Sequence, residues 1–206
     1  MSIKSEVKRK ALHLTGLTVP LLYLLFGQKV TIGFVATALI VFIILEPFRI
    51  VEELRDKLKQ KLGLYVREDV IALVERELEA ISREHEKYSI GSHIYFTIGA
   101  LIIISFFPKD IAIGAITVAT LGDAIAAIIG KPFGKHRFKN GKSIEGSLAY
   151  FLTAFLILLV LIDLPHALIG ALAGMLAEFY ELPPDDNFSN QLAVAIIIYV
   201  FRKIFF

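Results

Sequence analysis

The sequence predicts an all-α integral membrane protein with about seven transmembrane helices and a cytoplasmic amphipathic helical hairpin. Two observations carry this fold class: 56% of the 206 residues are hydrophobic, and the mean hydropathy is +0.68. A soluble domain averages about 45–50% apolar residues even when glycine is counted. The apolar residues also form uninterrupted blocks, whereas an amphipathic soluble helix needs them at periodic positions. We therefore expect one membrane domain over residues 1–206.

Most of the apolar blocks are shorter than the roughly 20 residues that an upright membrane helix needs. Flanking residues, snorkelling lysines or a locally thinned membrane would cover the difference. The expected membrane segments are, approximately, residues 11–26, 30–45, 93–107, 111–130, 147–162, 164–177 and 188–206.

Composition excludes several other classes of protein. The chain has no cysteine, so it is not a disulfide-stabilised secreted scaffold, and its apolar blocks exclude a disordered tail. A formal net charge of only +2 argues against a nucleic-acid-binding module. We therefore expect membrane lipids and no nucleic acid among its partners, while the sequence leaves the oligomeric state open.

The positions of lysine and arginine predict the sidedness of the loops. Seven crossings place 18 of the 22 Lys and Arg residues on one side, in the N-terminal segment, in residues 46–91 and in the 131–145 loop. Positive residues stay preferentially on the cytoplasmic side. We therefore expect a multi-pass protein of the cell membrane whose active site faces the cytoplasm.

Residues 50–87 form the longest polar stretch between apolar blocks. Leu54, Leu58 and Leu62 recur at helical spacing, and the pattern resumes at Val66. This periodicity predicts two amphipathic helices, broken near Gly63, that lie as a hairpin on the cytoplasmic membrane surface.

Asp123 is the most informative residue, because it lies inside the apolar segment 111–130. Placing an aspartate near the centre of a membrane helix costs about 2.5–3.5 kcal/mol on insertion scales. Either a cationic partner or a bound metal must offset this cost. The adjacent Gly122 and Ala124 are small, so another helix or a ligand can approach the backbone closely. The simpler alternative is an aspartate that pairs with a lysine and only holds the bundle together.

A basic loop rich in glycine begins about two helical turns after Asp123. Lysine and arginine donate hydrogen bonds to phosphate oxygens, and glycine permits close backbone approach. The cytoplasmic location alone would explain the cations, but not the glycines or the nearby acid. We interpret the loop and the acid together as a site where Asp123 binds Mg²⁺ and the loop binds phosphates. The loop contains Lys131, Lys135, Arg137, Lys139, Lys142, Gly130, Gly134, Gly141 and Gly146.

The end of this loop also predicts a helix start. Ser143 is placed to cap the next membrane helix, whose free N–H groups would then face the basic loop as an anion site. Glu145 lies in the first turn, where a carboxylate favours the helix dipole, so capping is its simplest role. The Gly141-Lys142-Ser143 run is not a P-loop, because Gly134 is two residues too far away and no strand precedes it.

Two further polar groups belong to the same side. Arg9, Lys10 and His13 begin the first helix; the first two suit interfacial anchors, but His13 lies slightly inside the membrane segment. Near the other end, an acidic turn has no lysine or arginine. It predicts a second metal contact, a partner for the basic loop, or a turn that is merely closed by prolines and capped by aspartates. The turn contains Glu178, Glu181, Asp185, Asp186 and Asn187.

Together these motifs resemble the polyprenol kinase family, which includes dolichol kinase and phytol kinase and shares a superfamily with phosphatidate cytidylyltransferase. The resemblance spans almost the whole chain, and its central motif is specific in length and order. It rests on Arg9-Lys10 with His13, on Glu84–Glu86, on the run from Gly122-Asp123 to Gly134-Lys135, on Lys142 to Ser147, and on Glu178 with Asp185-Asp186-Asn187.

The resemblance implies an Mg²⁺-dependent lipid kinase that transfers the γ-phosphate of CTP to an isoprenoid alcohol such as dolichol, phytol or another polyprenol. Asp123 would coordinate the metal, and Glu145, His13 or the Asp185-Asp186 pair would orient the alcohol or accept its proton. The implied nucleotide-binding residues are Lys131, Gly134, Lys135, Arg137, Lys142, Ser143 and Gly146, and the implied metal ligands are Asp123, Asp185 and Asp186.

Two alternatives remain. A phosphatidate cytidylyltransferase would make a CDP-lipid with the same loop and aspartate, but such enzymes usually carry a late His-Gly-Gly signature, and here His166 is followed by Ala167. A small transporter or lipid-binding membrane protein would use Asp123 as an ion-coupling residue. The absence of paired halves in the sequence argues against this, because many transporters contain internal repeats.

Overall fold

The computed structural model describes residues 11–205 except 12, 68 and 74–89. Within these ranges the chain is helical, and its only β-type pairing is an isolated bridge between Arg137 and Ser143. The predicted all-α fold class is therefore confirmed. The elements are η1 (Leu14–Leu17), α2 (Thr18–Ile50), α3 (Glu52–Leu62), α5 (Ser92–Phe106), α6 (Lys109–Phe133), α7 (Ile144–Leu161), α8 (Leu164–Tyr180) and α9 (Asp186–Phe205).

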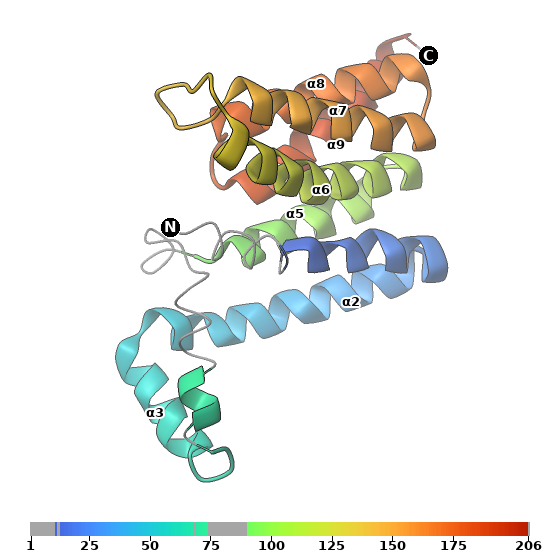
Figure 1. Cartoon of the computed structure of the whole chain (residues 1–206). Coiled ribbons are helices and arrows are strands. Elements are labelled where there is room, and N and C mark those ends of the chain that lie inside the picture. Colours follow the sequence, from blue (N-terminus) through green and yellow to red (C-terminus); the bar gives the residue numbers. More distant parts are fainter. Residues whose placement is uncertain (1–10, 12, 68, 74–89, 206) are drawn as a thin grey trace.

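The helices α5 to α9 each match one expected membrane segment, with both ends within three residues of the predicted ends. The first two segments fall in η1 and α2, which is interrupted at Gly27 with φ +79° and ψ −179°. Glycine adopts this conformation readily because it has no Cβ. Figure 1 shows the chain reversing direction there, so that the dark blue and light blue parts run in opposite directions.

Four helical stretches of the described chain are long and apolar enough to cross a membrane, namely Leu14–Pro47, Lys109–Phe133, Ile144–Leu161 and Asp186–Phe205. The apolar helices α5 and α8 are shorter, with 15 and 17 residues. These helices support a multi-pass membrane protein. The reversal at Gly27 is compatible with seven crossings, and that count stays a prediction.

The helix α6 lies at the centre of the bundle (Figure 1). In its apolar window 72% of the residues are buried, against 17% for the window of Leu14–Pro47. It packs against α2, α5, α7, α8 and α9. By contrast, α2 exposes large apolar side chains such as Leu25 and Ile44, as expected for a helix that faces lipid. Polar residues in the buried part of α6 are therefore surrounded by protein, and Asp123 is one of them.

The polar segment after α2 is described in its first half. The helix α3 ends at Leu62, and Gly63 follows as its C-cap, so the predicted break near Gly63 is confirmed. Residues 69–73 are helical again, and residues 74–89 lie outside the described chain. Figure 1 shows α3 extending away from the bundle. Its placement on the cytoplasmic membrane surface stays a prediction.

Glycines allow α6 and α7 to approach closely where the basic loop joins them. A Cβ on Gly146 would lie 3.1 Å from both the carbonyl oxygen of Ala126 and the Cα of Gly130, and one on Gly134 would collide with the carbonyl oxygen of Gly130. Gly141 has a φ of +81° in the turn of the loop. Packing and turn geometry thus account for these glycines. The predicted nucleotide contacts of Gly134 and Gly146 stay predictions.

The Gly146→Val substitution is expected to lower the melting temperature in detergent. The added side chain meets backbone atoms that cannot rotate away, and overpacking of this kind costs about 1–3 kcal/mol. Gly33→Val is the matched control, because Gly33 is also helical and a Cβ there meets nothing within 4 Å. Equal melting temperatures for the two variants would contradict the proposed packing role of Gly146.

Candidate active site

The buried acid on α6 meets a histidine from the start of the chain. Asp123 is 8% exposed and lies ten residues before the last residue of α6, which is roughly 15 Å along the helix axis. His13 Nε2 lies 3.5 Å from Asp123 Oδ2. His13 is held there because η1 packs closely on α6, with the Cβ position of Gly16 only 3.3 Å from Thr120 Oγ1. The structure therefore brings these two predicted site residues together.

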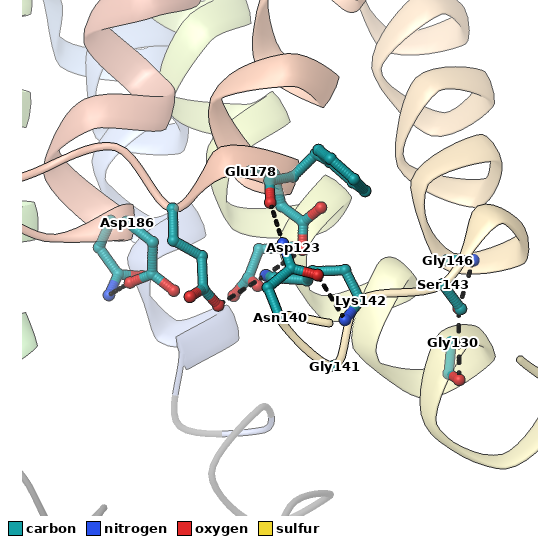
Figure 2. A network of polar contacts seen from close by, with 12 residues as sticks. Asp123, Gly130, Asn140, Gly141, Lys142, Ser143, Gly146, Glu178 and Asp186 are labelled. Atoms are coloured by element: carbon teal, nitrogen blue, oxygen red, sulfur yellow. Dashed lines mark hydrogen bonds and ion pairs between the residues drawn. The ribbon is translucent and has the colours of Figure 1, made fainter. Parts of the chain in front are cut away.

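Lys142 reaches the same region from the loop between α6 and α7. Its Nζ atom lies 2.6 Å from Glu178 Oε1 on α8 and 3.3 Å from Glu181 Oε1. Figure 2 shows the side chains of Lys142, Glu178 and Asp123 gathered at this point. The acidic turn thus provides a partner for the basic loop through Glu178, which was one of the three roles open for it.

The charge state of Lys142 follows from its surroundings. Burial lowers the pKa of the Lys142 amine, but the negative charges of Glu178, Glu181 and Asp123 outweigh this effect, so the pKa is raised above its usual 10.5. Lys142 therefore carries a positive charge at neutral pH.

The loop that carries Lys142 is folded back on itself and attached to the end of α8. Phe138 N donates to Lys142 O at 2.8 Å, which closes the turn. Asn140 Nδ2 donates to Phe179 O at 2.8 Å, and the rings of Phe138 and Phe179 meet edge to face at 4.8 Å between centroids. These contacts fix the loop where Lys142 can reach Glu178.

The other predicted cations of the loop lie differently. Arg137 Nη2 donates to the carbonyl oxygens of Gly130 at 3.0 Å and of Lys131 at 2.7 Å. The guanidinium thus binds carbonyl groups at the C-terminal end of α6, and that of Gly130 also accepts the backbone N–H of Gly134. The side chains of Lys131 and Lys135 are exposed. The predicted contacts of all three cations with phosphates stay predictions.

At the start of α7, Ser143 Oγ accepts a hydrogen bond from Gly146 N at 3.1 Å. The predicted N-cap is therefore confirmed. Glu145 Oε1 lies 2.8 Å from His136 Nδ1 and also accepts from the backbone N–H of His136. Glu145 thus holds the basic loop against α7, and a role of Glu145 in catalysis stays a prediction.

In the acidic turn, Asp185 caps the first turn of α9. Its Oδ1 atom accepts from Asn187 N at 2.9 Å, and Asn187 Nδ2 donates to both Asp185 and Asp186. Burial and the charge of Asp186 raise the pKa of Asp185 above its usual value. Within the described ranges, no three His, Asp or Glu side chains are close enough together to hold a metal. The metal contacts predicted for Asp123, Asp185 and Asp186 stay predictions.

Three predicted site residues, Arg9, Lys10 and Glu86, lie outside the described part of the chain. Conversely, sequence reasoning missed Tyr150, which is fully buried on α7 with its ring against Gly122. In the sequence, only its position within an apolar segment and the small residues of other segments could have indicated that Tyr150 is buried at the site. Its significance depends on contacts between helices that the sequence does not reveal.

The fold and these contacts define a multi-pass membrane protein with a buried charged centre close to the end of the bundle that carries the basic loop. No model of a known protein family matches the chain, and no solved structure matches it. The dolichol kinase of Schizosaccharomyces pombe is 42% identical over 85 residues, which cover 37% of this chain and 17% of that protein.

Two further relatives are also kinases by name. The CTP-dependent diacylglycerol kinase of Schizosaccharomyces pombe is 31% identical over 81 residues, 38% of this chain and 37% of that protein. A probable chloroplastic phytol kinase of Triticum aestivum is 29% identical over 160 residues, 68% of this chain and 51% of that protein. The matched stretches thus span about half or less of each of these three kinases. These partial relatives support a polyprenol-kinase-like family and, more broadly, a lipid kinase.

The Lys142→Met substitution is expected to lower the melting temperature of the nucleotide-free protein, because it leaves Glu178 buried without its cation. Removing one partner of a buried ion pair costs about 3–5 kcal/mol. We expect a smaller loss here, because 19% of the Lys142 side chain is exposed. The double variant Lys142→Met/Glu178→Gln should recover part of the loss.

Lys135→Met is the matched control for this prediction, because Lys135 is an exposed lysine of the same loop. It should leave the melting temperature unchanged. If Lys142→Met also melted like the wild type, the ion pair with Glu178 would contribute nothing to stability, and Lys142 would be available entirely for a ligand.

The ion pair also predicts a dependence of stability on high pH. Since the pKa of Lys142 is raised in the folded protein, its contribution is complete below pH 10.5 and is lost as the pH rises through the raised value. The wild-type melting temperature should therefore fall more steeply above pH 10.5 than that of Lys142→Met. Parallel curves for the two proteins would contradict this assignment.

Proposed function

We propose that this chain is a CTP-dependent kinase of an isoprenoid alcohol, acting at the cytoplasmic face of the cell membrane. The observation that carries the proposal is the buried Asp123, which lies beside His13 and within the field of Lys142. The names of the relatives support the lipid kinase class, the isoprenoid alcohol and the use of CTP. Residues 1–206 would work as one membrane domain, with residues 50–87 as a cytoplasmic insertion.

The carboxylates near Asp123 suit a hard divalent cation. Asp123, Glu178 and Asp186 come from α6, α8 and α9, and their charges all act on the hydroxyl of Tyr150. This much negative charge repels a nucleoside triphosphate unless a cation neutralises it. Mg²⁺ with a nucleotide typically uses one or two carboxylates plus phosphate oxygens and water, so a group of three protein ligands is not required.

In this proposal Asp123 holds the cation, with the Asp185-Asp186 turn as the second contact. Bound Mg²⁺ would neutralise the charge on the transferred phosphoryl group. The ammonium group of Lys142 would bind a phosphate oxygen, which requires only a small shift from Glu178 because the lysine side chain is flexible. The exposed Lys131 and Lys135 would bind the outer part of the nucleotide.

His13 is the best placed of the candidate proton acceptors. Its Nε2 atom is 3.5 Å from Asp123, whereas Glu145 is engaged with His136 and Asp185 caps α9. A histidine accepts a proton near neutral pH, and a neighbouring carboxylate stabilises the resulting imidazolium. The alcohol would present its hydroxyl at this depth, while its isoprenoid tail stays in the hydrocarbon of the bilayer.

CTP labelled in the γ-phosphate should transfer its label to extracted lipid when the purified protein is given a C20 isoprenoid alcohol and Mg²⁺. Asp123→Asn should reduce this rate by at least about 100-fold, because loss of the carboxylate removes several kcal/mol of charge stabilisation. Asp110→Asn is the matched control, since it changes an acid to an amide on the same helix but near its other end.

Three outcomes of this experiment would contradict the proposal. Transfer of label only from the α-phosphate of CTP to phosphatidate would indicate a cytidylyltransferase. Full activity of Asp123→Asn would remove the role of Asp123 in binding the cation. The absence of any transfer to lipid, together with flux of a solute into proteoliposomes, would indicate a transporter.

A further inference from the structure

One buried polar group in the centre of the bundle has no role in the proposed reaction. Tyr150 lies on α7 and is 0% exposed, and its hydroxyl has no hydrogen-bond partner among the described residues. A buried hydroxyl that makes no hydrogen bond is costly, because it has lost its contacts with water. A phenylalanine would avoid this cost, so the position of the hydroxyl requires an explanation.

The hydroxyl lies between α6 and α8, at the level of the charged centre. The ring of Tyr150 packs against Gly122, where a Cβ would lie 2.9 Å from Cε2, and Gly122 directly precedes Asp123. A Cβ on Gly174 would lie 3.0 Å from the hydroxyl oxygen, and Gly174 is one helical turn before Glu178 on α8. Two glycines thus leave the space that this tyrosine fills.

The hydroxyl lies in the electrostatic field of Asp123 and of two further carboxylates. The charges of Asp123, Glu178 and Asp186 act on it, with that of Asp123 the strongest of the three. A neutral phenol is a hydrogen-bond donor, and carboxylates are acceptors. Carboxylates that bind a metal are themselves held by hydrogen bonds, which orient their oxygens.

We propose that Tyr150 is a positioning residue that donates a hydrogen bond to the Asp123 carboxylate when a divalent cation binds there. The inference rests on the proposed function, because that function supplies the cation. Tyr150 acts through Asp123 and does not touch the reacting atoms. In this proposal a bound cation would hold the Asp123 carboxylate in reach of the Tyr150 hydroxyl, which would then have a hydrogen-bond acceptor.

The test is a titration of wild type and Tyr150→Phe with Mg²⁺, in which the melting temperature at each Mg²⁺ concentration reports binding. The titration is done with and without a non-hydrolysable nucleoside triphosphate. The variant should bind Mg²⁺ about 10- to 100-fold more weakly than the wild type, as observed when the hydrogen bond to a metal ligand is lost. Its melting temperature without Mg²⁺ should equal or exceed that of the wild type, because no existing hydrogen bond is broken. Tyr199→Phe is the matched control, because Tyr199 lies in the C-terminal half of α9, whereas Asp186 lies at its start. This variant should bind Mg²⁺ like the wild type.

Each other result overturns the inference. Equal Mg²⁺ affinity for wild type and Tyr150→Phe excludes a positioning role. A lower melting temperature of the Mg²⁺-free variant assigns the hydroxyl a structural contact instead. If the melting temperature of the wild type does not depend on Mg²⁺, the inference fails together with the proposed cation site. Transfer of γ-phosphate to lipid, measured separately, then decides whether the kinase proposal stands without Mg²⁺.

Discussion

The arrangement of the bundle around the basic loop depends on one constraint, the burial of a carboxylate on its central helix. Asp123 lies on α6, which neighbouring helices surround, so water cannot compensate its charge fully. Polar groups from other parts of the sequence contribute to this compensation, among them His13 and Lys142. His13 at the start of η1 and Lys142 in the loop before α7 both reach toward α6 for this. Both side chains thus meet at the acid of the central helix.

The basic loop serves two purposes that its composition alone does not separate. Arg137 and Asn140 attach the loop to the ends of α6 and α8, and Glu145 attaches it to α7. Lys142 is thereby directed into the bundle, whereas Lys131 and Lys135 remain exposed. One lysine of the loop thus belongs to the buried centre, whereas Lys131 and Lys135 lie at the surface of the molecule.

The sequence predicted the features that depend on local composition. Apolar blocks located α5 to α9 closely, and the position of Ser143 before an apolar run predicted its capping contact. Contacts between distant helices could not be predicted in this way. The pairing of Glu178 with Lys142 was one of several open roles. The close backbone approach expected at Gly146 was assigned to a nucleotide, whereas the structure has α6 there. Tyr150 was missed because its surroundings come from two other helices, α6 and α8.

The contact between His13 and Asp123 has a consequence for how the chain enters the membrane. A polypeptide is synthesised from its N-terminus, so the segment with His13 is made well before α6, whereas Lys142 and Glu178 follow it. When the aspartate enters the lipid phase, an imidazole is already present to share its charge. The ammonium group arrives only with the next loop. The order of the polar residues along the chain thus lets the acid acquire its partners one after another during biogenesis.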